Sequence, residues 1–219
     1  NSVTVSFSRM MRKEKANIIS VKQELIKLST KSWQEHIRDL KPLNETIFDR
    51  LKEVGSNMIF ADSTGLELSG ERFLTVSILF KNLLEKEVKN QNIGLLLPST
   101  VAGAFINYSV LMMGKTLVNL NYTSEINSLK TAIESAQIKT IITSKKFIEK
   151  LENKGINIKE ILEMAEVIYV EDLKEKISRP KGIFTYFSVK LMPSFILKAI
   201  HLRKTSKADT VLILFSSGS

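Results

Sequence analysis

Short apolar runs alternate with helix-like patterns through the middle of the chain. Residues Ile93–Leu97 form a compact apolar run that ends at Pro98, which is typical of a strand buried on both faces. Residues 100–113 are small and apolar, as in a buried helix. Further strands are predicted at residues 116–120, 140–143, 166–170 and 210–215, with helices from 123 to about 136 and from 144 to about 151. The pattern predicts an α/β fold, with a mostly parallel sheet and helices on both faces.

A β-hairpin is predicted ahead of this sheet. Residues 57–69 contain a short apolar strand, a turn signal from Asp62 to Gly65, and an alternating segment. Residues 71–88 then repeat apolar side chains at helical spacing. Farther along, Thr123 or Ser124 is the predicted N-cap of the helix that follows.

Ligands of open parallel sheets bind beyond the carboxyl ends of the strands. Functional residues are therefore expected just after Leu97, Leu120, Thr143, Val170 and Phe215.

The last of these strand ends leads into Ser216, Ser217, Gly218 and Ser219. Small residues let backbone N–H groups point inward and hydroxyls add donors, so such a loop suits the phosphates of ATP. The alternative is a flexible Gly/Ser tail. The apolar strand before the loop favours the phosphate site, although the Gly-Lys-Ser/Thr ending of a P-loop is absent as far as the sequence runs.

Composition narrows the chemistry. The 219 residues include no Cys and only two His, His36 and His201. A disulfide framework and a thiolate metal site are excluded, a multi-histidine metal site is disfavoured, and a Ser-His-acid triad has few candidates. No metal ligand and no catalytic residue is therefore assigned in this chain. The first 20 residues lack the apolar stretch of a signal peptide, and the Asn at the start indicates a piece of something longer.

The net charge of +9 is unevenly distributed. Residues 1–31 and 174–207 are strongly basic, whereas residues 32–173 carry more acidic than basic side chains. A nucleic-acid-binding domain needs a basic face on its folded core, so no nucleic acid partner is expected. We interpret residues 1–31 as a basic linker and residues 32–219 as the start of a large domain.

A basic and apolar stretch covers residues 183–204. Two lysines and Pro193 interrupt residues 183–200, which argues against a transmembrane span. Three alternatives remain: two helices packed on the sheet with lysines reaching outward, an amphipathic hairpin on an anionic membrane surface, or a wall of an acyl channel.

Other polar residues have simpler interpretations. Trp33 and His36 are expected to form a packing or docking pair, and His201 to lie on a solvated helix face. Asp62 is expected in a turn. Glu171 and Asp172 follow the fourth strand of the sheet, and the alternatives for them are strand-end carboxylates or a role in binding a ligand.

The run Thr210–Ser219 resembles the start of the phosphate-binding signature of the AMP-forming acyl-CoA synthetase superfamily, in which a strand leads into a Gly/Ser/Thr loop. Asn92–Pro98 is similar to the first core strand of that family, and Met113–Thr123 to its following glycine turn and strand. The resemblance implies the N-terminal part of the large domain of an adenylate-forming ligase, preceded by a β-hairpin. It implies ATP phosphate binding by Ser216, Ser217, Gly218 and Ser219.

A finer resemblance rests on shorter matches. Asn121–Thr123, Ile138–Ser144, Val170–Lys174 and Leu191–Pro193 are similar to the acyl-acyl carrier protein synthetase half of bifunctional 2-acylglycerophosphoethanolamine acyltransferases. Residues 8–11 resemble the stretch that joins the two halves of those enzymes, so residues 1–31 would be a linker from an acyltransferase domain.

This resemblance implies a reaction and its partners. A fatty acid would be activated with ATP and Mg²⁺ and passed to acyl carrier protein or coenzyme A. Reacylation of a lysophospholipid would follow at the cytoplasmic side of the bacterial inner membrane. The remaining motifs of the family lie downstream of its phosphate loop, so this chain alone is expected to be inactive and to bind no cofactor tightly. The alternatives are a long-chain fatty acid CoA ligase, a non-catalytic nucleotide- or lipid-binding module, and a membrane-docking regulatory segment.

Overall fold

The computed structural model of the chain describes residues 5–38 and 40–215. Contacts divide the chain into two compact units, Asn1–Pro42 and Leu43–Ser219. The smaller unit contains the 3₁₀ helix η1 (Lys13–Lys15) and the helix α1 (Ile18–Arg38). The sequence interpretation ended the basic linker at residue 31, and this position lies inside α1. The helix continues because residues 29–38 contain no Gly or Pro to end it.

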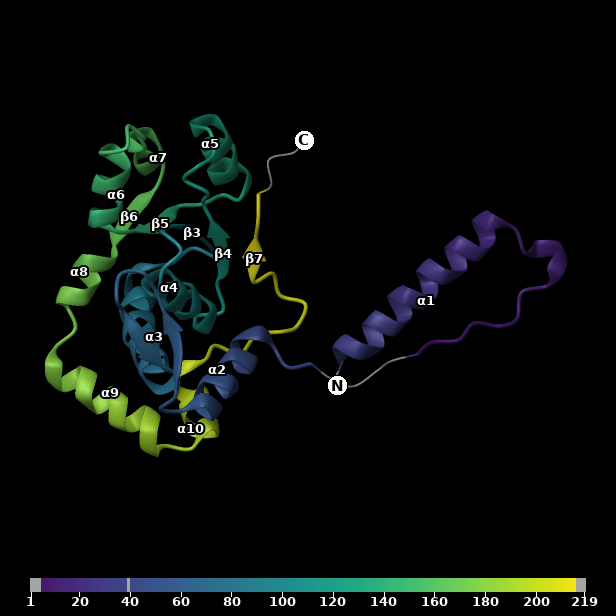
Figure 1. The fold of residues 1–219 in the computed structure, drawn as a ribbon, viewed down its shortest axis with the longest axis horizontal. Coiled ribbons are helices and arrows are strands. Elements are labelled where there is room, and N and C mark those ends of the chain that lie inside the picture. The colour runs from purple at the N-terminus through teal and green to yellow at the C-terminus, as the bar shows by residue number, and fades with distance from the viewer. Residues whose placement is uncertain (1–4, 39, 216–219) are drawn as a thin grey trace. The chain divides into compact units, whose positions relative to one another are not determined.

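The larger unit is built around a parallel sheet, which confirms the predicted fold class (Figure 1). Among the described residues the strand order is β6-β5-β3-β4-β7, and each neighbouring pair is parallel. The strands are β3 (Asn92–Leu96), β4 (Thr116–Asn119), β5 (Thr140–Thr143), β6 (Glu166–Tyr169) and β7 (Leu212–Ile213).

Helices precede the first strand of the sheet and connect the strands that follow. Their bounds are α2 (Leu43–Val54), α3 (Gly70–Glu87), α4 (Val101–Met112), α5 (Ile126–Ser135), α6 (Lys145–Glu152), α7 (Lys159–Glu163), α8 (Val170–Glu175), α9 (Arg179–Leu191) and α10 (Ser194–His201). The predicted helix at residues 71–88 is confirmed as α3, and the predicted helices at 100–113 and 144–151 as α4 and α6.

The sheet is buried on both faces because its side chains alternate between two cores. Leu95 and Leu117 point into a core with α2, α3 and α4, whereas Leu96 and Val118 point into a core with α5, α6 and α7. This period of two explains why the strands are continuous apolar runs in the sequence. Figure 1 shows the two helix layers on either side of the sheet.

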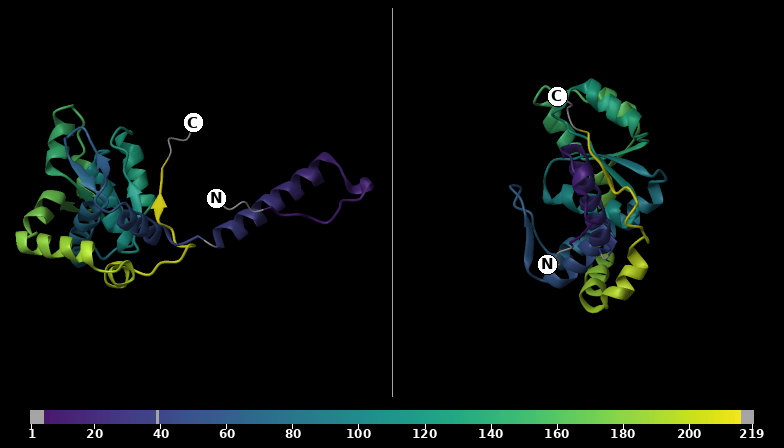
Figure 2. Two further views of the ribbon diagram at one scale, coloured as in Figure 1. Left: turned by 60° about the horizontal axis from the view of Figure 1, so that its bottom comes forward. Right: turned by 90° about the vertical axis from the view of Figure 1, so that its right-hand side faces the viewer.

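The predicted β-hairpin is confirmed by the antiparallel strands β1 (Met58–Ala61) and β2 (Glu67–Ser69). Figure 2 shows it at the edge of the larger unit. Phe60 of β1 stacks on Phe73 of α3 with 4.1 Å between the ring centroids. The hairpin is therefore held on the helix layer by aromatic packing.

Two predicted boundaries are wrong. The last strand pairs with β4 only over Leu212 and Ile213, whereas six residues were predicted. The helix α5 has Glu125 at its N-cap instead of Thr123 or Ser124. The Asn121 side chain accepts hydrogen bonds from the Thr123 N–H and hydroxyl, so Thr123 belongs to a tight turn and is not free to cap the helix.

Candidate functional site

A cavity of about 620 Å³ opens at the carboxyl ends of β3 and β4, a size usual for small-molecule sites. Its wall combines the β1–β2 hairpin, the loop after β3, the first turns of α4, the loop after β4 and the chain after β7. The lining residues are Phe60, Ala61, Asp62, Leu95, Leu97, Pro98, Ser99, Thr100, Val101, Gly103, Ala104, Asn107, Asn119, Leu120, Asn121, Tyr122, Leu214 and Phe215.

Most of this lining is apolar or uncharged. The polar side chains are chiefly hydroxyls and amides, such as Ser99, Thr100, Asn119 and Asn121. Asp62 is the single carboxylate among the described lining residues, which include no Lys, Arg or His. The described part of the wall is suited to binding and shape selection, because it carries no strong base or nucleophile.

Asp62 reaches from the hairpin turn to the N-terminus of α4. One of its carboxylate oxygens accepts a 2.7 Å hydrogen bond from the Val101 N–H, and the other accepts from the hydroxyl and N–H of Thr64. The hydrogen bond from the Thr64 hydroxyl, followed by that from Val101, lowers the pKa of Asp62 below its ordinary value. The positive end of α4 is therefore already matched by a carboxylate of the protein.

The loop between β3 and α4 also caps the first turn of α4. The Thr100 hydroxyl oxygen accepts a hydrogen bond of 3.2 Å from the Gly103 N–H, as an N-cap does. A Cβ atom on Gly103 would lie 2.6 Å from the carbonyl oxygen of Pro98, so only glycine allows this approach. The loop that forms the cavity floor is thus fixed by the helix that it precedes.

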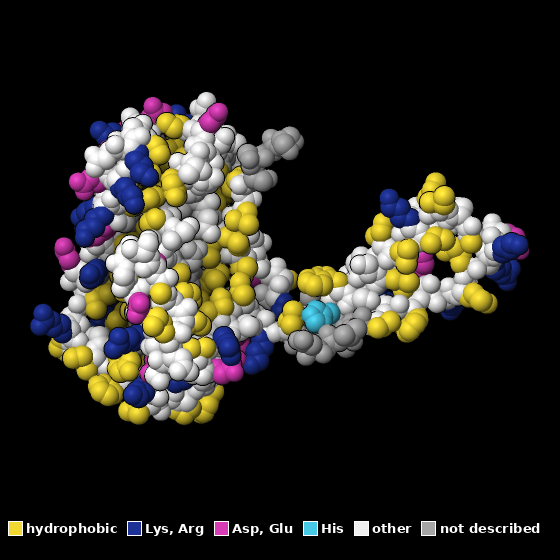
Figure 3. Space-filling model, in the orientation of Figure 1, with side chains coloured by type: hydrophobic (Ala, Val, Ile, Leu, Met, Phe, Trp, Pro, Cys, Tyr) yellow, Lys and Arg dark blue, Asp and Glu magenta, His cyan; other side chains and the backbone are white. Residues whose placement is uncertain are grey.

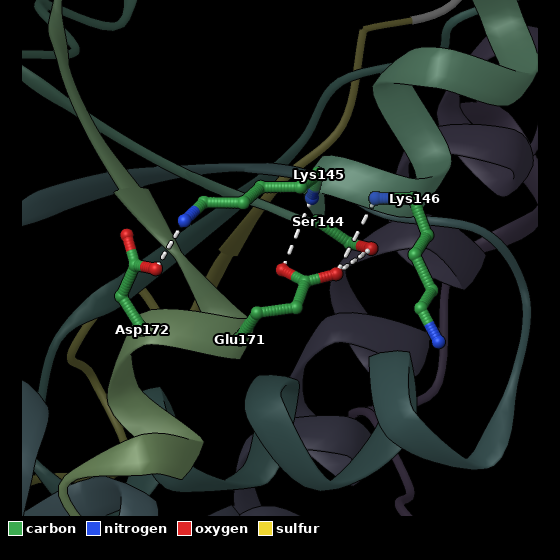
Figure 4. Close-up of polar contacts among 5 residues, drawn as sticks. All are labelled: Ser144, Lys145, Lys146, Glu171 and Asp172. Carbon is green, nitrogen blue, oxygen red and sulfur yellow. Dashed lines mark hydrogen bonds and ion pairs between the residues drawn. The ribbon is translucent and has the colours of Figure 1, made fainter.

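The other half of the same sheet edge is closed by a polar network (Figure 4). Glu171, at the start of α8, accepts hydrogen bonds from the Ser144 hydroxyl at 2.7 Å and from the N–H groups of Lys145 and Lys146. Burial by itself raises the pKa of Glu171, but these hydrogen bonds outweigh it and the pKa lies below its ordinary value. Asp172 forms an ion pair with the Lys145 ammonium.

In this network Glu171 and Asp172 are strand-end carboxylates that bind neighbouring groups of the protein. Glu171 occupies the N-terminus of α6, and Ser144 caps the same helix by accepting from the Phe147 N–H. Both carboxylates bind groups of the protein itself, and neither lines the cavity. Their role in this structure is to hold α6 and α8 together.

Three of the five predicted strand ends meet at the cavity. The residues after Leu97 and Leu120 line it, and Phe215 lines it directly. The residues after Thr143 and Val170 form the network instead. Sequence reasoning missed Asp62, which was assigned only to a turn, because nothing in the hairpin sequence reports that it approaches α4.

The predicted phosphate loop, Ser216, Ser217, Gly218 and Ser219, lies outside the described residues. Its immediate predecessors, Leu214 and Phe215, line the cavity. Among residues 5–38 and 40–215 no group of three or more His, Cys, Asp or Glu side chains is placed to hold a metal ion.

Neither histidine is among the described residues that line the cavity. His201 is only partly exposed at the end of α10, and burial together with the charge of Lys81 lowers its pKa. Trp33 and His36 lie side by side on α1 with 6.1 Å between ring centroids, as expected of a packing pair.

The basic and apolar stretch forms the two helices α9 and α10. They pack on α3 and α2, not on the sheet as one alternative predicted. Neither helix lines the cavity at the sheet edge, so they are not part of that wall. In the part of the chain that the structure describes, no helix is both long enough and apolar enough to cross a bilayer.

Solved structures similar to this chain include adenylate-forming ligases. VinN shares 16% identity with this chain at a TM-score of 0.57, with 82% of this chain and 44% of VinN covered. The N-terminal subdomain of NpsA from Klebsiella oxytoca, in complex with 3-hydroxyanthranilyl-AMSN, shares 13% identity at a TM-score of 0.58, with 82% and 38% covered. A fatty acyl CoA synthetase of Mycobacterium tuberculosis shares 13% identity at a TM-score of 0.55, with 80% and 32% covered.

At these identities the likeness establishes the fold of the N-terminal part of such ligases. The chain spans less than half of the length of each of these three structures. No family model matches the sequence.

Proposed function

We propose that this chain is part of an ATP-dependent, adenylate-forming acyl ligase. The observation that carries the proposal is the cavity at the carboxyl ends of β3 and β4, in a fold shared with adenylate-forming ligases. Open parallel sheets bind their ligands at this edge. The reaction would join a carboxylic acid to AMP with release of pyrophosphate.

In this proposal Ser216, Ser217, Gly218 and Ser219 bind the phosphates of ATP. The strand β7 runs parallel to β4 and its extension, Leu214 and Phe215, lines the cavity, which supports a loop at this edge. Backbone N–H groups and hydroxyls there would stabilise the charge that develops on the leaving pyrophosphate.

Mg²⁺ would accompany ATP, and the described residues do not supply a site for it. The one carboxylate of the cavity wall, Asp62, already accepts hydrogen bonds at both oxygens from Thr64 and Val101. Residues outside the described ranges or the ATP phosphates would have to hold the ion, and no step is assigned to it here.

The cavity itself is proposed to take the acyl part of the substrate. Its lining is apolar or uncharged apart from Asp62, whose lowered pKa keeps it ionised at neutral pH. A negative charge beside the cavity disfavours a phosphate or a second carboxylate there and leaves an alkyl chain unaffected. The fatty acid would therefore place its tail in this cavity, with its carboxyl group toward the loop after Phe215.

For the second half-reaction we propose transfer of the acyl group to the phosphopantetheine thiol of acyl carrier protein. A linked acyltransferase, preceding the basic residues 1–31, would use it to reacylate a lysophospholipid at the cytoplasmic side of the bacterial inner membrane. This proposal rests on the sequence resemblance. Coenzyme A is the competing acceptor, and the likeness to a fatty acyl CoA synthetase supports it.

An assay of the full-length protein with both thiols separates the two acceptors. Radiolabelled fatty acid, ATP and Mg²⁺ are supplied with either acyl carrier protein or coenzyme A, and the thioester is quantified. We expect thioester formation on acyl carrier protein. Activity with coenzyme A alone would contradict the choice of acceptor, and no ATP-dependent product with either thiol would contradict the ligase.

A further inference from the structure

The helix α9 is apolar on two opposite faces. Thr185 and Val189 are buried against the body of the larger unit. Phe184 and Leu191 point away from it, with exposed fractions of 74% and 75%. A helix that buries one apolar face and leaves a second one exposed has a surface that a further partner would cover.

The next helix, α10, also exposes apolar side chains. Leu197 is fully buried, whereas Phe195 on the other side of the helix is 71% exposed and Ile200 is more than half exposed. We call this surface the α9–α10 apolar face, defined by Ile183, Phe184, Phe187, Leu191, Phe195 and Ile200. Figure 3 shows hydrophobic side chains along the lower edge of the larger unit, where Figure 1 places these two helices.

The opposite side of the two helices is anchored, so this face is held outward. The Lys52 ammonium of α2 donates to the carbonyl oxygens of Val189 and Met192 at the turn between the helices. Lys198 forms a 2.8 Å ion pair with Asp49 of α2. Because these contacts are made by the inner side, rotation of the helices to bury the exposed phenylalanines would break them.

The charged side chains that this segment itself contributes all have one sign. From Lys176 to Ala208 the sequence contains eight Lys or Arg side chains and no Asp or Glu. At 100° per residue, Lys181 and Lys190 fall on the two sides of the outward face of α9. The face is thus an apolar strip bordered by ammonium groups.

We propose that the α9–α10 apolar face lies on the surface of an anionic lipid bilayer, with its phenylalanine and leucine side chains in the acyl boundary and its lysines among the headgroups. Outward Phe and Leu bordered by Lys are the features of helices that lie in the membrane interface. The absence of acidic side chains over this segment complements anionic lipid. An acidic soluble protein or a second copy of the chain is the competing occupant, and the test distinguishes them.

The first experiment measures sedimentation of the 219-residue chain with vesicles of phosphatidylglycerol and phosphatidylcholine, and with phosphatidylcholine alone. We expect binding to the anionic vesicles at low salt and its loss at high salt, because screening removes the electrostatic part. The double variant Phe184→Ser/Leu191→Ser should lose affinity for the anionic vesicles by about tenfold or more. Lys181→Glu/Lys190→Glu should lose the preference for anionic lipid.

The matched control is on α1, which also exposes apolar side chains. Leu25 and Ile26 are 61% and 57% exposed, and the variant Leu25→Ser/Ile26→Ser removes a similar apolar area from the smaller unit. We expect this variant to bind as the parent does. If it loses binding while Phe184→Ser/Leu191→Ser keeps it, the proposal is wrong. Circular dichroism of each variant confirms that the fold is retained.

A second readout reports where the face sits. Trp33 is the single tryptophan of the chain. In the variant Trp33→Phe/Phe187→Trp, the only indole stands on the α9–α10 apolar face. We expect its emission to shift to the blue with anionic vesicles and to be quenched by lipids brominated on the acyl chain. Unchanged emission, or a blue shift that depends on protein concentration without lipid, would overturn the proposal, the latter in favour of self-association.

Discussion

The two halves of the sheet edge share one kind of contact, a carboxylate bound to a helix N-terminus, but they differ in what lies beside it. In each half, a carboxylate from another element binds the N–H groups of a helix that follows a strand. Asp62 binds α4 from the hairpin and leaves a cavity of about 620 Å³. Glu171 binds α6 from α8 and also accepts from the Ser144 hydroxyl, so the groups at this strand end bind one another (Figure 4).

The difference comes from where each carboxylate starts. Glu171 is the second residue after β6, the strand that pairs with β5, so its side chain lies beside the end of β5. Asp62 sits at the tip of a hairpin that packs on α3, and it reaches α4 from outside the sheet. Glu171 comes from the neighbouring strand end and binds groups at the end of β5. Asp62 comes from the more distant hairpin and forms one wall of the cavity.

The largest expected effect is on the proposed phosphate loop. In the full-length protein, Ser217→Ala/Ser219→Ala should lower the rate of adenylate formation by about a hundredfold, because hydroxyl donors to the developing charge are lost. The matched variant in the closed half, Ser144→Ala, should change that rate by less than about twofold. Equal losses in the two variants would show that the two halves do not differ in function.

Filling the cavity comes next. Ala104 of α4 lines it, and Ala104→Phe should raise the KM for a long-chain fatty acid by about tenfold while leaving the KM for ATP nearly unchanged. Lys146→Phe places the same aromatic side chain on the exposed side of α6, away from the cavity lining, and is the control. A change in the KM for ATP without a change for the fatty acid would assign the cavity to the nucleotide instead.

A smaller effect is expected on stability in the closed half. Glu171→Ala removes the acceptor for Ser144, Lys145 and Lys146, and should lower the free energy of unfolding by about 1 kcal/mol, as the loss of a helix cap does. Urea denaturation measures it. Adenylate formation by the full-length variant should remain near the parent rate, and a large loss of activity would give Glu171 a role beyond the cap.

The smallest effect concerns pH. The folded pKa of His201 is lowered, so its neutral form stabilises the fold above its ordinary pKa of about 6.5, and that contribution is lost as the pH falls below this value. The folded pKa of Glu171 is lowered too, so its contribution is present above about 4.3 and is lost at lower pH. His201→Gln should flatten the upper step and Glu171→Gln the lower one. Thermal melts from pH 8 to about 3 resolve the two, and a single unchanged curve would contradict both assignments.

The sequence predicted the sheet well and the site in part. Buried strands such as Ile93–Leu96 can be recognised in the sequence as unbroken apolar runs, because helices cover both faces of the sheet. The positions after Leu97 and Leu120 line one cavity, because the strand order brings these two strand ends together, and a ligand there stays a prediction.

What the sequence did not reveal depends on contacts between distant segments. The hydrogen bond that the Val101 N–H donates to Asp62 and the one that the Ser144 hydroxyl donates to Glu171 join residues that no local pattern connects. The same holds for α9, whose two apolar faces give no clear helical periodicity although one of them is buried. Local chemistry predicted the elements, and their packing decided which strand ends stay open.

The most direct test of the account is fatty-acid-dependent exchange of radiolabelled pyrophosphate into ATP by the full-length protein. Exchange reports formation of the acyl-adenylate alone and needs no thiol acceptor. We predict exchange that requires both Mg²⁺ and a long-chain fatty acid and that falls strongly in the Ala104→Phe variant at limiting fatty acid. Full-length protein that is folded and binds ATP yet shows no exchange with any carboxylic acid would contradict the assignment as an adenylate-forming ligase.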